Sequence, residues 1–274
     1  MKAKFKLSNL YLVFVFIVIY LPIAYLIFYS FNTGATMDKF TGFSMKHYTT
    51  LLSDTRMISI VLNTVVIALL SSLLATLIGT LGALWINQLK RRSAKNAVLS
   101  VNNVLMVSPD VIIGASFLIF FSFLGFKLGF TSVLLSHIAF SIPIVVLMVL
   151  PKINEMPRTM IDAAYDLGAS KWQALSRVIL PTITPGIFAG YFMAFTYSLD
   201  DFAVTFFVTG NGFSTLSIEI YSRARQGVDL EVNALSTLMF LVSLLLVVGY
   251  YVLERYGHSR RVNRNKMMKG PNAQ

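Results

Sequence analysis

Three carboxylates stand inside otherwise apolar stretches of the 274-residue sequence: Asp110, which follows Pro109, and the adjacent pair Asp200 and Asp201. A carboxylate surrounded by apolar groups is costly unless it meets a cation, a hydrogen-bond donor or a water-filled cavity. Aromatic faces attract alkylammonium groups. The aromatic residues nearest the acidic pair in the sequence are Tyr191, Phe195, Tyr197 and Phe202. These residue types predict a path for a cationic solute, and its predicted lining is Asp110, Asp200, Asp201, Tyr197 and Phe202.

The three acids also allow other roles. Adjacent residues point to different sides of a helix, so Asp200 and Asp201 cannot both face one path. One can line the path while the other caps a broken helix, satisfies backbone donors or pairs with a neighbouring subunit. Pro109 lacks an N–H and favours a kink, which opens backbone groups beside Asp110 to a cavity. In the alternative interpretation, the acids pair inside the protein and the aromatic side chains pack or face lipid.

One long polar segment separates two strongly apolar stretches in the second half of the chain. Pro157 stands where a helix start is expected and Gly168 where a C-cap is expected, with good helix formers between them. We therefore expect a helix over about 158–167, a glycine break, and a second short helix over about 171–179 that ends before Pro181.

The spacing inside this segment, residues 151–182, resembles the EAA motif of ABC importer permeases. That motif is EAA, three residues, glycine, nine residues and I-x-L-P; the matching residues are Asp162-Ala163-Ala164, Gly168 and Val178-Ile179-Leu180-Pro181. Asp162 replaces the usual Glu and Val178 the usual Ile. In that family the segment is the coupling helix, which sits in a cleft of the cytoplasmic ATPase subunit. The resemblance implies that Asp162, Ala163, Ala164 and Gly168 couple to the ATPase. We expect Asp166, one turn from Asp162, and Trp172, a large amphipathic anchor, to belong to the same surface.

The composition indicates which kind of fold positions these residues. Hydrophobic residues make up 56% of the chain and charged residues 13%, which is typical of a polytopic membrane protein. We predict an all-α integral membrane protein, with a transmembrane domain over residues 1–257 and a basic tail over 258–274. Its six predicted transmembrane helices lie near residues 10–31, 58–86, 97–124, 130–150, 183–208 and 234–253.

The basic residues predict the orientation of these helices. On the six-span arrangement, 17 of the 23 Lys and Arg residues fall on the side that holds the amino terminus, the 151–182 segment and the tail. Positive charge marks the cytoplasmic side, so both termini are predicted to be cytoplasmic. The net charge of +11 is then explained by this bias and by contact with lipid headgroups, and no nucleic-acid partner is expected.

Beyond the polar segment, the chain resembles the second permease subunit of spermidine/putrescine ABC importers over essentially its whole length. The residues that carry this resemblance are Ser198–Phe202, Phe206–Gly210, Ile220–Ser222 and Glu231–Thr237. It implies the type I importer fold in a bacterial inner membrane, a similar but distinct permease partner, two copies of a cytoplasmic ATPase and an external polyamine-binding protein. The sequence contains no GxxxxGK[ST] loop, so ATP and Mg are expected on the ATPase, and no cofactor, catalytic residue or metal site is expected in this chain.

Two alternative functions remain open from the sequence. Within the same class, the solute can be an amino acid, thiamine or a metal chelate. From another class, the chain can be an ion-coupled secondary transporter or channel that uses Asp200 and Asp201 as proton or cation sites. The second alternative predicts transport without any ATPase and no loss of transport when Gly168 is changed.

Two further features are predicted to be structural. Gly186, Gly190 and Ala194 form a stripe of small residues that favours close helix packing, within the chain or across a dimer. His137 lies near Pro143 in the fourth apolar run, where we expect a packed or hydrogen-bonded helix defect and no site.

Overall fold

The computed structural model describes residues 7–34, 36–227, 230–245 and 247–249, which form helices and connecting loops. The helices are α1 (Leu7–Tyr29), α2 (Lys46–Ser53), α3 (Thr55–Gln88), α4 (Arg92–Val107), α5 (Asp110–Phe123), α6 (Phe130–Asn154), α7 (Arg158–Asp166), α8 (Lys171–Ala174), η1 (Leu175–Ile179), α9 (Leu180–Asp200), α10 (Ala203–Val208) and α11 (Leu216–Gln226). A further apolar helix covers Leu230–Gly249. The chain divides into two compact units: unit 1 comprises Met1–Ile60 and Glu219–Gly249, and unit 2 comprises Val61–Ile218 and Tyr250–Gln274.

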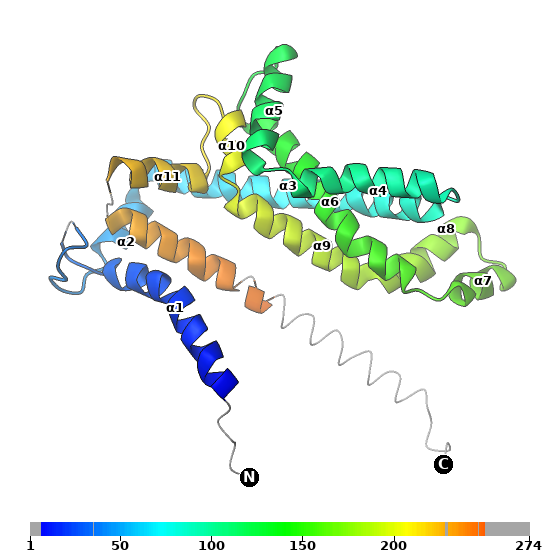
Figure 1. Cartoon of the computed structure of the whole chain (residues 1–274). Helices are drawn as coiled ribbons and strands as arrows, with labels where there is room; N and C mark the ends of the chain where they lie inside the picture. The colour runs from blue at the N-terminus through cyan, green and yellow to red at the C-terminus, as the bar shows by residue number, and fades with distance from the viewer. Residues whose placement is uncertain (1–6, 35, 228–229, 246, 250–274) are drawn as a thin grey trace, which may run out of the picture. The chain divides into compact units, whose positions relative to one another are not determined.

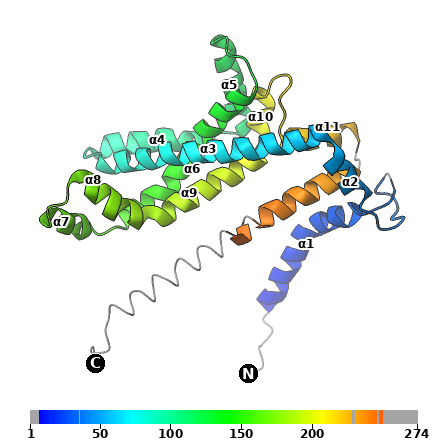
Figure 2. The ribbon, with the colours of Figure 1, turned by 180° about the vertical axis from the view of Figure 1, so that it is seen from behind.

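The centre of unit 2 is a close packing of α3, α6 and α9, which run side by side in both views (Figures 1 and 2). Small residues allow this approach. A Cβ added to Gly79 would lie 2.7 Å from Val145 Cβ, and one added to Gly186 would lie 2.9 Å from the Met148 carbonyl oxygen. The stripe of small residues in α9 therefore packs against α6 within the chain. The buried core between these helices includes Ala75, Ala83, Val145, Val149, Ile183 and Ala194.

Five helices in the described part of the chain are long and apolar enough to cross a membrane, and a sixth span is formed if α4 and α5 count as one broken helix. The kink expected at Pro109 is present, but it is a bend of 103° between α4 and α5. The apolar run expected over residues 97–124 as the third span is therefore divided between α4 and α5 at the expected kink. Ser108 and Pro109 adopt extended backbone conformations, because Pro109 cannot donate the hydrogen bond that would continue α4.

The second short helix that was expected to end before Pro181 does not end there. Helical structure runs from Lys171 to Asp200 without a break. The reason lies in η1, a π-helical turn in which the Leu180 N–H donates to the Leu175 carbonyl. Pro181, which has no N–H, is the second residue of α9 and directly follows this wider turn.

The fifth predicted span, near residues 183–208, is broken at its far end. α9 stops at Asp200, and α10 begins at Ala203. α10 packs closely on α5, since a Cβ added to Gly114 would lie 3.0 Å from the Val204 Cα. A second buried core of unit 2 surrounds this contact and includes Ile67, Ile113, Phe121, Val133, Phe140, Val204 and Val208.

Unit 1 contains α1, α2 and the helix over Leu230–Gly249. Its loop after α1 is organised by buried Asn32, whose side chain donates to the Thr36 and Lys39 carbonyls and accepts from Thr41 N–H. His47 Nε2 lies 2.9 Å from the Asn32 carbonyl oxygen. The basic tail predicted over residues 258–274 lies outside the described residues.

Candidate functional site

The predicted coupling segment forms a helix, a glycine turn and a second helix. α7 ends at Asp166, and Gly168 follows in the left-handed region with φ of +83°. The Gly168 N–H donates to the Tyr165 carbonyl and the Ala169 N–H to the Ala164 carbonyl, which is the Schellman pattern. The helix predicted over residues 158–167 and the glycine C-cap are thus confirmed.

The second helix of the segment starts with a capping box. The Gln173 N–H donates to Ser170 Oγ, and the Ser170 N–H donates to Gln173 Oε1. Both ends of the turn are therefore satisfied by hydrogen bonds within the segment itself.

Several large apolar side chains of α7, α8 and the turn between them are exposed. Leu167 is 89% exposed and Trp172 is 71% exposed, and large apolar side chains at Met160 and Tyr165 are exposed as well. Exposed apolar side chains gathered on one short segment are typical of a surface that binds a partner. A Cβ added to Gly168 would meet no atom within 4 Å, so the turn is also open.

Among the predicted coupling residues, Asp162, Ala163, Asp166, Gly168 and Trp172 are exposed, and Ala164 is half-buried. Asp162 also lines a pocket of about 290 Å³ together with Arg158, Asn154 and Asn87. This pocket lies where the ends of α3 and α6 meet α7, so Asp162 borders both the chain's own pocket and the open surface.

At the other end of α9, the structure separates the two adjacent acids. Asp201 is buried, and its carboxylate accepts hydrogen bonds from the Val204 N–H, the Thr205 N–H and the Thr205 hydroxyl. It therefore caps the first turn of α10, one of the roles expected for one member of the pair. Asp200 is exposed and accepts no hydrogen bond or ion pair from any residue that the structure describes.

Asp110 and Tyr197 meet directly. The Tyr197 hydroxyl donates to Asp110 Oδ1 at 2.8 Å, which brings the first residue of α5 to the last turns of α9. Asp110 Oδ2 accepts no hydrogen bond from the described part of the chain. Phe202 lies in the break itself, and its ring centroid is 5.4 Å from that of Phe206. The predicted path residues therefore fall into three places: a tyrosine–carboxylate pair, an exposed carboxylate beside the aromatic break, and a buried cap.

A buried hydrogen-bond network beside the break was not predicted as part of the site. His137 on α6 is 1% exposed; its Nδ1 lies 2.6 Å from Ser198 Oγ and its Nε2 lies 2.8 Å from Thr205 Oγ1. Nε2 is also 3.5 Å from Asp201 Oδ2, which is a longer contact. Ser198 Oγ lies 2.9 Å from Ser71 Oγ on α3. The expectation of a hydrogen-bonded histidine is confirmed, and the sequence signal for this network was a polar ring in an apolar run.

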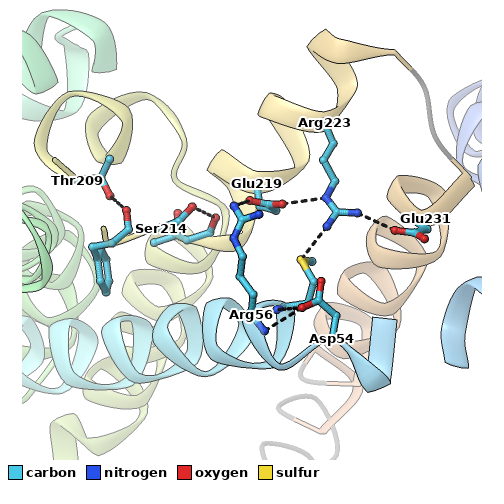
Figure 3. A network of polar contacts seen from close by, with 10 residues as sticks. Asp54, Arg56, Thr209, Ser214, Glu219, Arg223 and Glu231 are labelled. Atoms are coloured by element: carbon cyan, nitrogen blue, oxygen red, sulfur yellow. Dashed lines mark hydrogen bonds and ion pairs between the residues drawn. The ribbon is translucent and has the colours of Figure 1, made fainter. Parts of the chain in front are cut away.

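Unit 1 holds a separate network of ion pairs (Figure 3). Glu219 accepts from Arg56 and from Arg223, and Arg223 also donates to Glu231. Burial lowers the pKa of Arg223, but the hydrogen bonds and charges of Glu219 and Glu231 outweigh this and raise it above the usual value. The network ties the start of α3 to α11 and to the helix over Leu230–Gly249.

The sequence of the chain matches a known family and known transport proteins. Residues 75–262 match the model of a family described as binding-protein-dependent transport system inner membrane component. Over 237 residues, the chain is 38% identical to the spermidine/putrescine transport system permease protein PotC of Escherichia coli strain K12, covering 86% of this chain and 89% of that protein. It is 32% identical over 261 residues to the putrescine transport system permease protein PotI of the same organism, covering 93% and 92%.

The fold is also similar to solved transporter structures. A chain of a bacterial ABC transporter involved in the import of the acidic polysaccharide alginate aligns with a TM-score of 0.69 and 20% identity, covering 93% of this chain and 94% of that one. A chain of the MetNI methionine ABC transporter in an inward-facing conformation aligns with a TM-score of 0.62 and 18% identity, covering 74% and 98%. These likenesses concern the fold alone.

Proposed function

The chain belongs to the family of binding-protein-dependent transport system inner membrane components, and from this premise we propose that it forms half of the translocation path of an ATP-driven polyamine importer. The observation that carries the proposal is the 38% identity, over 86% of the chain, to a spermidine/putrescine permease. Spermidine and putrescine are flexible polycations, so their path needs available carboxylates and aromatic faces.

The residues near the α9–α10 break suit such a cargo. Asp200 is exposed and without a partner among the described residues, so it is available to an ammonium group. One carboxylate oxygen of Asp110 accepts a hydrogen bond from the Tyr197 hydroxyl, and the other oxygen is available to bind a cation. We infer that Asp200 and the Asp110–Tyr197 pair contact the polyamine, with Phe202 contributing an aromatic face, and that Asp201 keeps the break in shape.

The continuous helix from Lys171 to Asp200 supports a route from the cytoplasmic ATPase to this site. Its 30 residues span about 45 Å, enough to cross a bilayer. Its first turn lies next to the exposed Leu167 and includes Trp172, and its last residue is Asp200. A displacement of α7 and α8 by a closing ATPase is therefore carried along one helix to the carboxylate that faces the cargo.

We infer the partners from the proposed function. A second, similar permease completes the pore, one of two ATPase copies docks on α7 and α8, both copies bind ATP and Mg, and an external binding protein delivers the polyamine. In this proposal both termini are cytoplasmic and the chain itself hydrolyses no ATP. An amino-acid or chelate importer with the same coupling segment is the alternative, and it predicts uptake of those solutes in place of polyamines.

Uptake of radiolabelled spermidine and putrescine into vesicles that hold the reconstituted complex tests the proposal. We expect uptake that requires ATP hydrolysis and binding protein, and that excess unlabelled methionine or thiamine does not inhibit. Uptake driven by an ion gradient in the absence of the ATPase would support the secondary-transporter alternative. ATP-driven uptake of another solute, with none of either polyamine, would refute the substrate assignment and leave the permease assignment intact.

A further inference from the structure

The buried network beside the helix break joins four elements through one imidazole. His137, on α6, contacts Ser198 near the end of α9 on one side and Thr205 in α10 on the other. Ser198 is also hydrogen-bonded to Ser71 on α3, and Thr205 is also hydrogen-bonded to Asp201 in the break. All five side chains are buried, in the part of unit 2 where α3, α6 and α9 pack.

The carboxylate fixes the direction of these hydrogen bonds. Asp201 only accepts when ionised, so the Thr205 hydroxyl donates to Asp201 Oδ2 at 2.6 Å. Since its one proton is used, Thr205 Oγ1 accepts from His137 Nε2–H. In a neutral ring Nδ1 then accepts, so the Ser198 hydroxyl donates to it, and Ser71 donates to Ser198. Every proton in the network points toward Asp201, and the histidine needs no charge to complete it.

This network holds the chain in place on both sides of Asp200. Ser198, two residues before it, is held by one nitrogen of the ring; Asp201, the next residue, is held through Thr205 by the other nitrogen. Asp200 itself has no hydrogen-bond or ion-pair partner among the described residues, so its direction depends on how its two neighbours are held. Phe140 packs beside the ring, with its centroid 4.9 Å from that of His137.

We propose that His137 is a positioning residue that clamps the α9–α10 break and thereby determines how Asp200 is presented to the translocation path. Its effect on transport rests on the polyamine function proposed above, whereas its effect on the geometry of residue 200 does not. The imidazole is suited to this role because its two nitrogens lie on opposite edges of the ring and can bond two helices at once.

The first experiment measures the exposure of residue 200 without using any substrate. The sequence contains no cysteine, so Asp200→Cys and, as a reference in the loop before α6, Lys127→Cys each introduce a single thiol into this chain. Native cysteines of the other subunits are replaced. Both thiols are labelled with a membrane-impermeant maleimide in nanodiscs that hold the complex, with His137 intact, replaced by Phe, or replaced by Gln.

The variants at position 137 are chosen to separate the hydrogen bonds from the packing. His137→Phe keeps a ring and removes both hydrogen bonds, and His137→Gln keeps a single amide. Ser136→Ala is the matched control, because Ser136 is a neighbouring buried hydroxyl on α6 that has no hydrogen-bond partner within the described residues.

We expect the labelling rate of the thiol at position 200 to change at least threefold with His137→Phe, by less with His137→Gln, and not with Ser136→Ala. The thiol at position 127 should react at the same rate in every background. Equal rates at position 200 in an assembled His137→Phe complex would overturn the proposal. If that variant does not assemble, the Gln variant decides, and an unchanged rate there would also overturn it.

The second experiment asks whether His137 acts through Asp200 during transport. His137→Gln should raise the KM for spermidine uptake more than it lowers the maximal rate. Combined with Asp200→Asn, it should reduce uptake no further than Asp200→Asn alone, within about twofold. If the double variant reduced uptake by the product of the two single effects, His137 would act independently of Asp200, which would contradict the proposal. If the unchanged complex takes up no polyamine, the proposed function fails, and the labelling experiment still decides the clamp.

Discussion

At one end of the long helix from Lys171 to Asp200, Leu167 and Trp172 expose most of their apolar surface to solvent. At the other end, Asp201 and His137 are buried, and both are hydrogen-bonded to side chains or backbone of the same chain. The first region exposes apolar side chains that can bind a partner, whereas the polar groups of the second region form hydrogen bonds within the chain. The difference indicates that changes at the coupling segment should impair transport without unfolding the protein, and that changes at the buried residues Asp201 and His137 should do both.

The largest expected effect is that of Gly168→Asp. A Cβ at this position would meet no atom within 4 Å, but the aspartate backbone would have to adopt φ of +83° and its side chain would project from the proposed docking surface. We expect ATP-driven uptake to fall by about tenfold or more, within the usual range of coupling free energies, with assembly retained. Gly212→Asp is the matched control, since Gly212 has φ of +87° and equally open surroundings outside the coupling segment. Equal loss in both variants would attribute the effect to backbone strain.

Trp172→Ala tests whether the exposed coupling segment binds the ATPase. The side chain is 71% exposed, so its loss should leave the unfolding temperature of the isolated permease unchanged. If Trp172 anchors the ATPase, truncation should weaken docking by about 2 kcal/mol, as for other aromatic anchors. Titration of the ATPase against the reconstituted permease measures this. Unchanged affinity would remove Trp172 from the interface.

Asp201→Asn tests the buried hydrogen bonds at the α9–α10 break. An amide would place its own N–H groups against the Thr205 N–H or the Val204 N–H, so the cap of α10 would be partly lost. We expect a destabilisation of about 1–2 kcal/mol, visible as a lower unfolding temperature of the purified complex. Asp200→Asn is the control, because its carboxylate bonds to none of the described residues. Should both variants melt alike, the separate roles of the two acids would be wrong.

The smallest effect belongs to the ion pairs of unit 1. Arg56→Gln should change the unfolding free energy by about 0.5 kcal/mol or less, because its side chain is 70% exposed and Glu219 keeps Arg223. Arg223→Gln breaks two pairs and should cost about 1 kcal/mol. Thermal unfolding at low and high salt measures both. A larger cost for Arg56 than for Arg223 would contradict the arrangement in Figure 3.

The coupling segment could be predicted almost completely from the sequence, because its signals are local. Pro157, Gly168 and the spacing to Pro181 determine a helix, a turn and a second helix through backbone chemistry alone. The continuation of helix through Pro181 was missed, because a π-turn depends on a one-residue shift in hydrogen bonding that composition does not reveal.

The helix break was predicted less well, because it depends on contacts between distant residues. Asp200 and Asp201 were expected to have different roles, but which acid is the cap depends on Thr205 and on His137, which lies much earlier in the chain. Likewise, Pro109 predicted a kink but not its 103° angle, since the packing of α5 on α10 at Gly114 is a tertiary feature.

We propose that a polyamine passes Asp200 under the control of the ATPase. The measurement that tests it most directly is ATP-dependent uptake of radiolabelled spermidine by the reconstituted complex with Asp200→Asn, beside the unchanged complex. We predict that the variant assembles, melts at the same temperature and hydrolyses ATP, but takes up spermidine at least several-fold more slowly. Uptake by the Asp200→Asn complex equal to that of the unchanged complex would contradict the claim.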